Sequence, residues 1–194
     1  MHLALAHALP EADVIIHAGD FCNAGTINEG IKALAWFNAL PYKHRIIIAG
    51  NHDICMDKNH PDFGRERFGS SEYLLEHSVI PKSEGFHYLL DSGCEIDGVK
   101  FWGSPVQPEF FHWAFNMPRG QPLRRHWAQI PQDTDVLITH GPIYGVLDQC
   151  PDFSNPGQMV SVGDSQLGER VRSIKPSVHV CGHVHAGYGF QQEK

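Results

Sequence analysis

The stretch Ser177-Val178-His179-Val180-Cys181-Gly182-His183-Val184-His185 joins an apolar run to a polar cluster, and this pattern decides the fold. A short run rich in valine predicts a buried strand, and Gly182 marks its end. If the extended conformation continues, His183 and His185 point the same way, because side chains alternate with a period of two. We therefore expect two imidazoles at adjacent metal positions. His179 lies on the same face, deeper in the strand, where a core or hydrogen-bonding role is expected.

The same arrangement occurs three more times along the chain. Gly19-Asp20 follows the apolar run 14–18, Gly50-Asn51-His52-Asp53 follows 45–49, and His140-Gly141-Pro142 follows 135–139. Each cluster alone has an ordinary explanation, such as a turn residue or a strand-end histidine bonded to the backbone. All four together would bring carboxylate, amide and imidazole groups to the carboxyl edge of a sheet. This combination predicts a hydrolytic metalloenzyme.

Composition limits the remaining possibilities. The chain has 194 residues, 42% of them hydrophobic and 19% charged, which is typical of a globular protein, and we expect one domain over 1–194. The formal net charge of −7 gives no basic surface for a nucleic-acid polymer or a membrane. The five cysteines are odd in number and lack a C-x-x-C pair, which favours a reducing, cytoplasmic location. No apolar run approaches membrane-spanning length.

Apolar runs alternate with helical patterns, which indicates an α/β fold. Thr26 and Glu29 form a capping-box pattern that should start a helix ending before Pro41, and a second helix should follow Gly163 and end before Pro176. Residues 86–90 and 99–102 flank turn-rich sequence and are expected to be antiparallel strands. The aromatic-rich and proline-rich residues 105–131 are expected to form a loop-and-helix excursion over one edge of the site.

This series of motifs resembles that of the calcineurin-like metallophosphoesterases, which runs Asp-x-His, Gly-Asp, Gly-Asn-His-Asp/Glu, His and Gly-His-x-His. The likeness is greatest to the small MPPED-type phosphodiesterase branch and covers nearly the whole chain, including residues 12–21, 48–52, 113–115, 139–145 and 182–189. The resemblance implies a four-layer αββα sandwich with two divalent metals at one sheet edge. Mixed nitrogen and oxygen ligands suit manganese, which we favour, and also iron or zinc.

The resemblance also assigns roles to single residues. Asp20 would bridge the metals, and His52 would protonate the leaving oxygen after a metal-bound hydroxide attacks phosphorus. The second metal would be completed by Asn51, His140 and His183, and the first would be bound by His185. The excursion could form a base-stacking wall with a phosphate partner, made of Trp113, Phe115 and Arg119. The alternative is that these aromatic residues pack the excursion onto the sandwich.

The Asp-x-His motif does not occur before Gly19-Asp20, and residues 1–10 resemble the segment that follows it in the family. The first strand of the sandwich is therefore expected to be missing, which leaves an open sheet edge. The first metal position would keep only Asp20 and His185, and two ligands seldom hold a catalytic cation. His2 or His7 could supply a substitute ligand, although a solvated N-terminal helix is the favoured interpretation.

Two functions follow from these observations. The first is a metal-dependent phosphoesterase that hydrolyses phosphodiesters, including cyclic nucleotides, with a small phosphoester or nucleotide as its substrate. The alternative is a catalytically impaired protein that binds one metal and a nucleotide. A purely structural α/β domain does not explain why polar residues end four strands.

Overall fold

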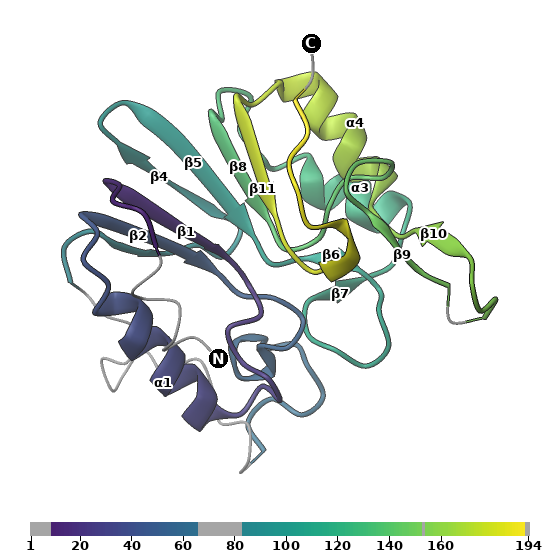
Figure 1. Cartoon of the computed structure of the whole chain (residues 1–194), viewed down its shortest axis with the longest axis horizontal. Coiled ribbons are helices and arrows are strands. Elements are labelled where there is room, and N and C mark those ends of the chain that lie inside the picture. Colours follow the sequence, from purple (N-terminus) through teal and green to yellow (C-terminus); the bar gives the residue numbers. More distant parts are fainter. Residues whose placement is uncertain (1–8, 66–82, 153, 193–194) are drawn as a thin grey trace.

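The computed structural model describes residues 9–65, 83–152 and 154–192, and it contains two β-sheets packed face to face (Figure 1). One sheet is parallel with the order β1-β2-β3, and the other has the order β11-β8-β5-β4. In the second sheet β4 is antiparallel to β5, and the other neighbours are parallel. The strands are β1 Val14–Ala18, β2 His44–Ile48, β3 Phe86–Tyr88, β4 Ser92–Ile96, β5 Val99–Ser104, β8 Val136–Thr139 and β11 Val178–Cys181.

Helices cover the outer face of each sheet, so the fold has four layers in the order αββα (Figure 1). Helix α1 (Ile27–Asn38) lies on the β1-β2-β3 sheet, and α3 (Gln121–Trp127) and α4 (Ser165–Ile174) lie on the other. This confirms the sandwich expected from the family resemblance. The remaining elements are β6 Gln107–Pro108, β7 Asn116–Met117, β9 Gln149–Pro151, β10 Met159–Ser161 and the 3-10 helices η2 Ile54–Met56 and η3 His185–Gly187.

The two faces of strand β2 belong to two different hydrophobic cores, one between the sheets and one under α1. Ile46 and Ile48 point between the sheets, where they join Leu89, Phe101 and Ile138, while Ile47 points toward α1. All three isoleucines are at most 1% exposed, so both faces of β2 are apolar, as expected for a strand covered on both sides. Opposite β2, Gly103 lets the sheets approach, because an added Cβ would lie 2.7 Å from Ile48 Cγ2 and Leu89 Cβ.

Both helix predictions are confirmed. The Thr26 hydroxyl accepts a hydrogen bond from the Glu29 N–H, and the Glu29 carboxylate accepts one from the Thr26 N–H at 2.9 Å, which completes the capping box. Helix α4 begins after Asp164, whose carboxylate accepts from the Gln166 N–H at 2.9 Å. The excursion over 105–131 contains β6, β7, α3 and their loops, as predicted.

The predicted pairing of 86–90 with 99–102 is wrong. Strand β3 instead pairs in parallel with β2, and β5 pairs antiparallel with β4. Ser92-Gly93 is part of the turn-rich sequence between the two runs, yet both residues belong to the edge strand β4, where Gly93 lies opposite Trp102. The hairpin turn is Asp97-Gly98, and both of its residues have positive φ, at 49° and 83°.

Strands β1 and β11 each pair on one side only within the described ranges, as β1 with β2 and β11 with β8. His2 and His7, considered as substitute ligands, lie outside the described residues. No helix in the described part of the chain is long and apolar enough to cross a membrane.

Candidate metal centre

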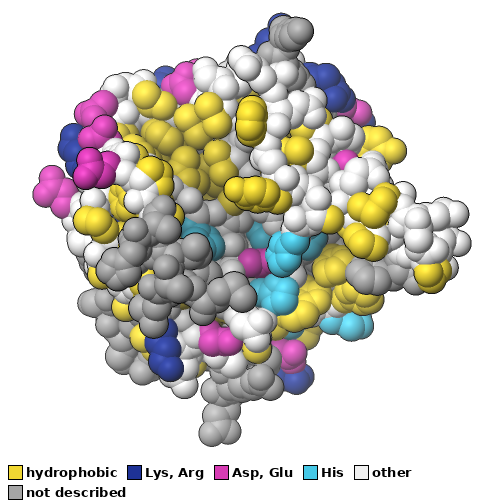
Figure 2. All heavy atoms as spheres, in the orientation of Figure 1, with side chains coloured by type: hydrophobic (Ala, Val, Ile, Leu, Met, Phe, Trp, Pro, Cys, Tyr) yellow, Lys and Arg dark blue, Asp and Glu magenta, His cyan; other side chains and the backbone are white. Residues whose placement is uncertain are grey.

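Four loops meet at the carboxyl edges of the two sheets, following β1, β2, β8 and β11. Figure 2 shows histidine side chains and an acidic side chain gathered in a hollow on this face. The closest group of candidate ligands consists of Asp20, His140 and His183, whose ligand atoms all lie within 4.8 Å of one another. The sequence pattern therefore predicted correctly which strand ends lie close together.

Asn51 lies at the middle of this group. Its Oδ1 is 2.9 Å from His140 Nε2 and 2.8 Å from His183 Nδ1, and the Asp20 carboxylate is 3.4 Å from His140 Nε2. Asn51 is 1% exposed and His140 is 0% exposed, so these contacts are shielded from water. All four ligands predicted for the second metal position thus converge.

The donor set of this group fits a divalent cation. His140 Nδ1 lies 2.9 Å from the Ala18 carbonyl, so a neutral imidazole keeps its proton there and turns the Nε2 lone pair inward. That lone pair faces the Asn51 amide oxygen and the Asp20 carboxylate, which are also acceptors. A cation among these groups would satisfy all of them, and the mixture of carboxylate, amide and imidazole suits manganese, iron or zinc.

The ionisation states of Asp20 and His183 agree with this donor set. Burial raises the pKa of Asp20, but the hydrogen bond and charge of His140 and the His52 N–H outweigh burial, so the pKa is lowered. Burial lowers the pKa of His140, but the Asp20 carboxylate more than offsets it, so that pKa is raised. This favours a proton on Nε2, which a bound cation would have to displace. Burial, followed by the charge of His140, lowers the pKa of His183 to about 4. His183 is therefore neutral at pH 7 and free to act as a ligand.

The backbone around the ligands explains why the clusters contain glycine. At Gly19 (φ 95°) an added Cβ would lie 2.6 Å from His140 Nδ1 and from the Ala49 carbonyl oxygen. At Gly50 an added Cβ would lie 2.5 Å from Asp20 Oδ1. Neither position has room for a side chain, so the ligands can approach one another only across glycine.

The two histidines after Gly182 do not follow the predicted alternation. His183 has a φ of 66°, which turns the chain out of the extended conformation, and His185 begins η3. The His183 ring turns to Asn51, whereas His185 is exposed. His185 still lies near enough that its charge contributes to lowering the pKa of His183. The prediction from the two-residue period was wrong because it assumed that the extended conformation continues to His185, whereas β11 ends at Cys181.

Asp53 connects the first two metal-site loops, a role that the sequence reasoning did not assign. Its Oδ2 accepts hydrogen bonds from the Asp20 N–H at 2.9 Å and the Gly50 N–H at 2.7 Å, and its Oδ1 accepts from the Cys22 N–H at 2.7 Å. The side chain is fully buried, and burial followed by the charge of Asp20 raises its pKa to about 7. Its place directly after Gly50-Asn51-His52 was the only available signal.

His52 lies beside the ligand group with one ring nitrogen already engaged. Its Nδ1 is 2.7 Å from the Asn23 carbonyl, which requires an N–H there and leaves Nε2 for another partner. The Trp113 ring covers the imidazole, with ring centroids 4.2 Å apart. Meanwhile the His52 main-chain N–H donates to Asp20 Oδ1 at 2.8 Å, so this loop also orients the proposed bridging carboxylate.

Three hydrogen bonds hold the loop that carries Trp113 in place. Asp57 accepts from the Phe115 N–H at 2.7 Å, His60 Nε2 lies 2.9 Å from the His112 carbonyl, and the Ala114 N–H donates to the Asn51 carbonyl at 3.0 Å. Phe115 itself is 8% exposed and belongs to the α1 core, so it cannot form the substrate-facing wall predicted for it. The alternative, in which aromatic residues pack the excursion onto the sandwich, applies to this residue.

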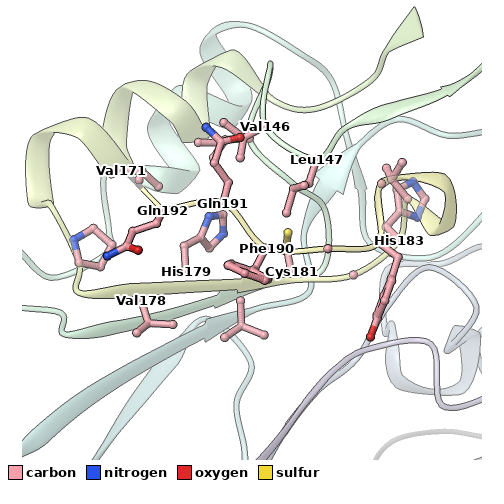
Figure 3. A pocket seen from close by; sticks show the side chains of 18 of the residues that line it. Val146, Leu147, Val171, Val178, His179, Cys181, His183, Phe190, Gln191 and Gln192 are labelled. Carbon is pink, nitrogen blue, oxygen red and sulfur yellow. The ribbon is translucent and has the colours of Figure 1, made fainter. Parts of the chain in front are cut away.

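A groove of about 1200 Å³ runs along β11, between this strand and the chain from Tyr188 to Gln192. His183 lies at one end of the groove (Figure 3). His179 lines the groove, and its Nε2 is 2.8 Å from the Thr139 hydroxyl, which confirms the expected hydrogen-bonding role. Burial lowers the pKa of His179 to about 4.

Comparison with known proteins agrees with this geometry. The calcineurin-like phosphoesterase family matches residues 2–187. Metallophosphoesterase domain-containing protein 1 of Homo sapiens is 39% identical over 196 residues, covering 95% of this chain and 58% of that protein. The UPF0046 protein K07C11.7 of Caenorhabditis elegans is 36% identical over 181 residues, covering 93% of this chain and 59% of that protein. The chain belongs to the calcineurin-like phosphoesterase family, in its branch of small metallophosphoesterase domains.

The chain spans about three fifths of the length of these curated relatives. A solved crystal structure shares the fold, with a TM-score of 0.58 at 15% identity, and the likeness covers 93% of this chain and 76% of that one.

Proposed function

We propose that this chain is a metal-dependent phosphoesterase that hydrolyses phosphodiesters. The convergence of Asp20, Asn51, His140 and His183 is the observation that carries the proposal, because these side chains offer acceptors to one another and together suit a divalent cation. Divalent cations bound there would activate water and offset charge on the phosphoryl oxygens. We favour manganese, with Asp20 as the shared carboxylate and His185 as the ligand that extends the site.

His52 is proposed to protonate the leaving oxygen. The Asn23 carbonyl holds the Nδ1 proton, so a second proton on Nε2 makes the ring a cation with its free N–H available to substrate. The Trp113 ring lies against the imidazole, with centroids 4.2 Å apart, and limits how the His52 ring can turn. Trp113 can also limit how a substrate approaches His52, and the exposed Arg119 is proposed as a further substrate contact.

Cyclic nucleotides are the phosphodiesters that we propose to test first, in keeping with the family branch. We place the reaction in the cytoplasm, because all five cysteines lie in the described part of the chain and none is in a disulfide. We propose no nucleic-acid polymer and no membrane as partner, since the net charge is −7.

The experiment compares His52→Ala with wild type on two phosphodiesters, one with a nitrophenol leaving group and one with a simple alcohol. We expect a loss of about 10²–10⁴-fold for the alcohol ester and a much smaller loss for the nitrophenyl ester, which needs little protonation. Manganese content should not change. His112→Ala, which alters an exposed side chain on the same loop as Trp113, is the matched control. Equal losses for both esters, or loss of metal, would show that His52 is not the proton donor.

A second candidate function is that of a catalytically impaired protein that binds one metal and a nucleotide. In its favour, the described residues contain one group of three or more close histidine and acidic ligands, and His185 is not part of it. Metal analysis of the purified chain decides between the two functions. One bound cation without turnover supports the binding protein, and two cations with turnover support the enzyme.

A further inference from the structure

A small cavity adjoins the candidate metal centre on the side of the loop that follows β6. Its volume is about 110 Å³, and His183 forms one of its walls. Phe110, Pro142 and Arg119 contribute other walls, and we call it the Arg119 cavity. The Phe110 ring stands edge-on to the His183 ring, with centroids 5.3 Å apart. A group attached to a phosphoryl centre at the metal ligands therefore has this cavity as its neighbour.

Arg119 is held in place by the main chain and not by an acid. Its Nη1 donates to the Gly163 carbonyl at 2.8 Å and its Nη2 to the Val162 carbonyl at 2.5 Å. A guanidinium has five N–H groups, so three remain available. Among the described residues, no carboxylate forms an ion pair with Arg119. Glu109 also lines the cavity but forms no ion pair with Arg119, so the guanidinium keeps N–H donors for a ligand.

The walls of the cavity indicate what kind of group would enter it. Phe110 and Pro142 present apolar rings, which suit a hydrocarbon or ring stem. Arg119 presents planar N–H donors, which match the oxygens of a carboxylate or phosphoryl group. The guanidinium is anchored to the turn before α4, whereas the metal ligands belong to other loops. Arg119 and His183 therefore line the same cavity from different loops, so a ligand in it can contact both.

We propose that the Arg119 cavity binds the substituent of the phosphoester and that Arg119 recognises a second anionic group on it. This inference rests on the proposed phosphoesterase function and names its substrate class: phosphoesters with a compact apolar stem that ends in a carboxylate or phosphoryl group. A cyclic nucleotide has a single anionic group and would leave Arg119 without a partner. We therefore expect cyclic nucleotides to bind less tightly than phosphoesters that carry a second anionic group.

Titration calorimetry with the manganese-loaded protein tests the proposal without any turnover. The probes are phenylphosphonate, 4-carboxyphenylphosphonate and 1,4-phenylenediphosphonate, which distinguish a carboxylate from a second phosphoryl group. Hydrogen bonds to charged groups contribute about 1.5–3 kcal/mol. The two probes that carry a second anionic group should therefore bind about 10–150-fold more tightly than phenylphosphonate. Arg119→Gln should bring this ratio close to one, and Arg119→Lys should keep part of it. Arg124→Gln is the matched control, because Arg124 is an exposed arginine paired with Glu169.

The affinity of the probes with a second anionic group, divided by the affinity of phenylphosphonate, separates recognition by Arg119 from a structural role. We call this quantity the ratio. If Arg119 only fixes the turn before α4, Arg119→Gln weakens all three probes equally and leaves the ratio unchanged, which overturns the proposal. A wild-type ratio near one, or no binding of any probe, also overturns it. The proposed function fails separately: a protein that keeps the ratio but hydrolyses no phosphoester has the anion subsite without the reaction. Hydrolysis with a ratio near one supports the reaction and rejects the subsite.

Discussion

Asp57→Ala removes a buried carboxylate that holds the Trp113 loop against the metal-site loops. Asp57 is 7% exposed, and its oxygens accept from the Phe115 N–H at 2.7 Å and the Asn59 N–H at 2.9 Å. Alanine cannot accept either hydrogen bond. The Phe115 N–H would remain buried without an acceptor, whereas Asn59 is exposed and can bond to water.

The two losses add up to a measurable change in stability. A buried donor left without a partner costs about 1–3 kcal/mol, and a lost hydrogen bond that water can replace costs about 1 kcal/mol. The expected decrease in the free energy of unfolding is therefore about 3 kcal/mol. For a chain of this size about 1 kcal/mol lowers Tm by about 2–4 °C, so Tm should fall by about 6–12 °C. Asp57→Asn keeps one acceptor oxygen and should lose about half as much.

Function should change along with stability, and metal binding should not. The displaced loop releases Trp113 from His52, so activity on esters with poor leaving groups should fall while manganese affinity stays within about two-fold of wild type. Thermal melts, manganese titration and hydrolysis assays are run on the same preparations. Asp62→Ala is the control, because Asp62 forms a surface ion pair with Arg65 that contributes about 0–1 kcal/mol. A Tm within about 2 °C of wild type would refute the reasoning.

Three further predictions concern other parts of the chain. Asp20→Asn should abolish activity and weaken manganese binding more than Asn51→Ala does, because the charge is lost; calorimetric titration measures this, and a metal-independent drop in Tm would instead identify Asp20 as a turn-capping residue. Thr26→Ala should remove the α1 cap and cost about 1 kcal/mol in urea unfolding, with no change in metal affinity. Burial lowers the pKa of His179 to about 4, so unfolded chains bind a proton below pH ~6.5 before the native state does. Stability should hold above that pH and fall by about 2 kcal/mol at pH 5, and His179→Gln should remove that part of the decrease.

The local features of this protein could be read from the sequence. Four apolar runs that each end in a polar cluster predicted four strands and the candidate ligands that follow them, because a strand delivers the residue after it to the sheet edge. The burial expected for these strands holds for most of β2 and β8, whereas β1 and β11 are partly exposed. Thr26 and Glu29 predicted the start of α1, because a capping box involves only residues three apart. Asp20, Asn51, His140 and His183 were found for this reason.

The tertiary structure decided what depends on contacts between distant segments. The pairing of β3 with β2 instead of β5 depends on which strands meet in space, and a turn-like Ser92-Gly93 cannot report that. The turn at His183 and the burial of Phe115 depend on neighbours far away in the chain. The same is true of Asp53 and Arg119, because their partners are main-chain groups that no side-chain pattern records. Sequence periodicity specifies an element and its faces, and only the folded chain specifies what each face meets.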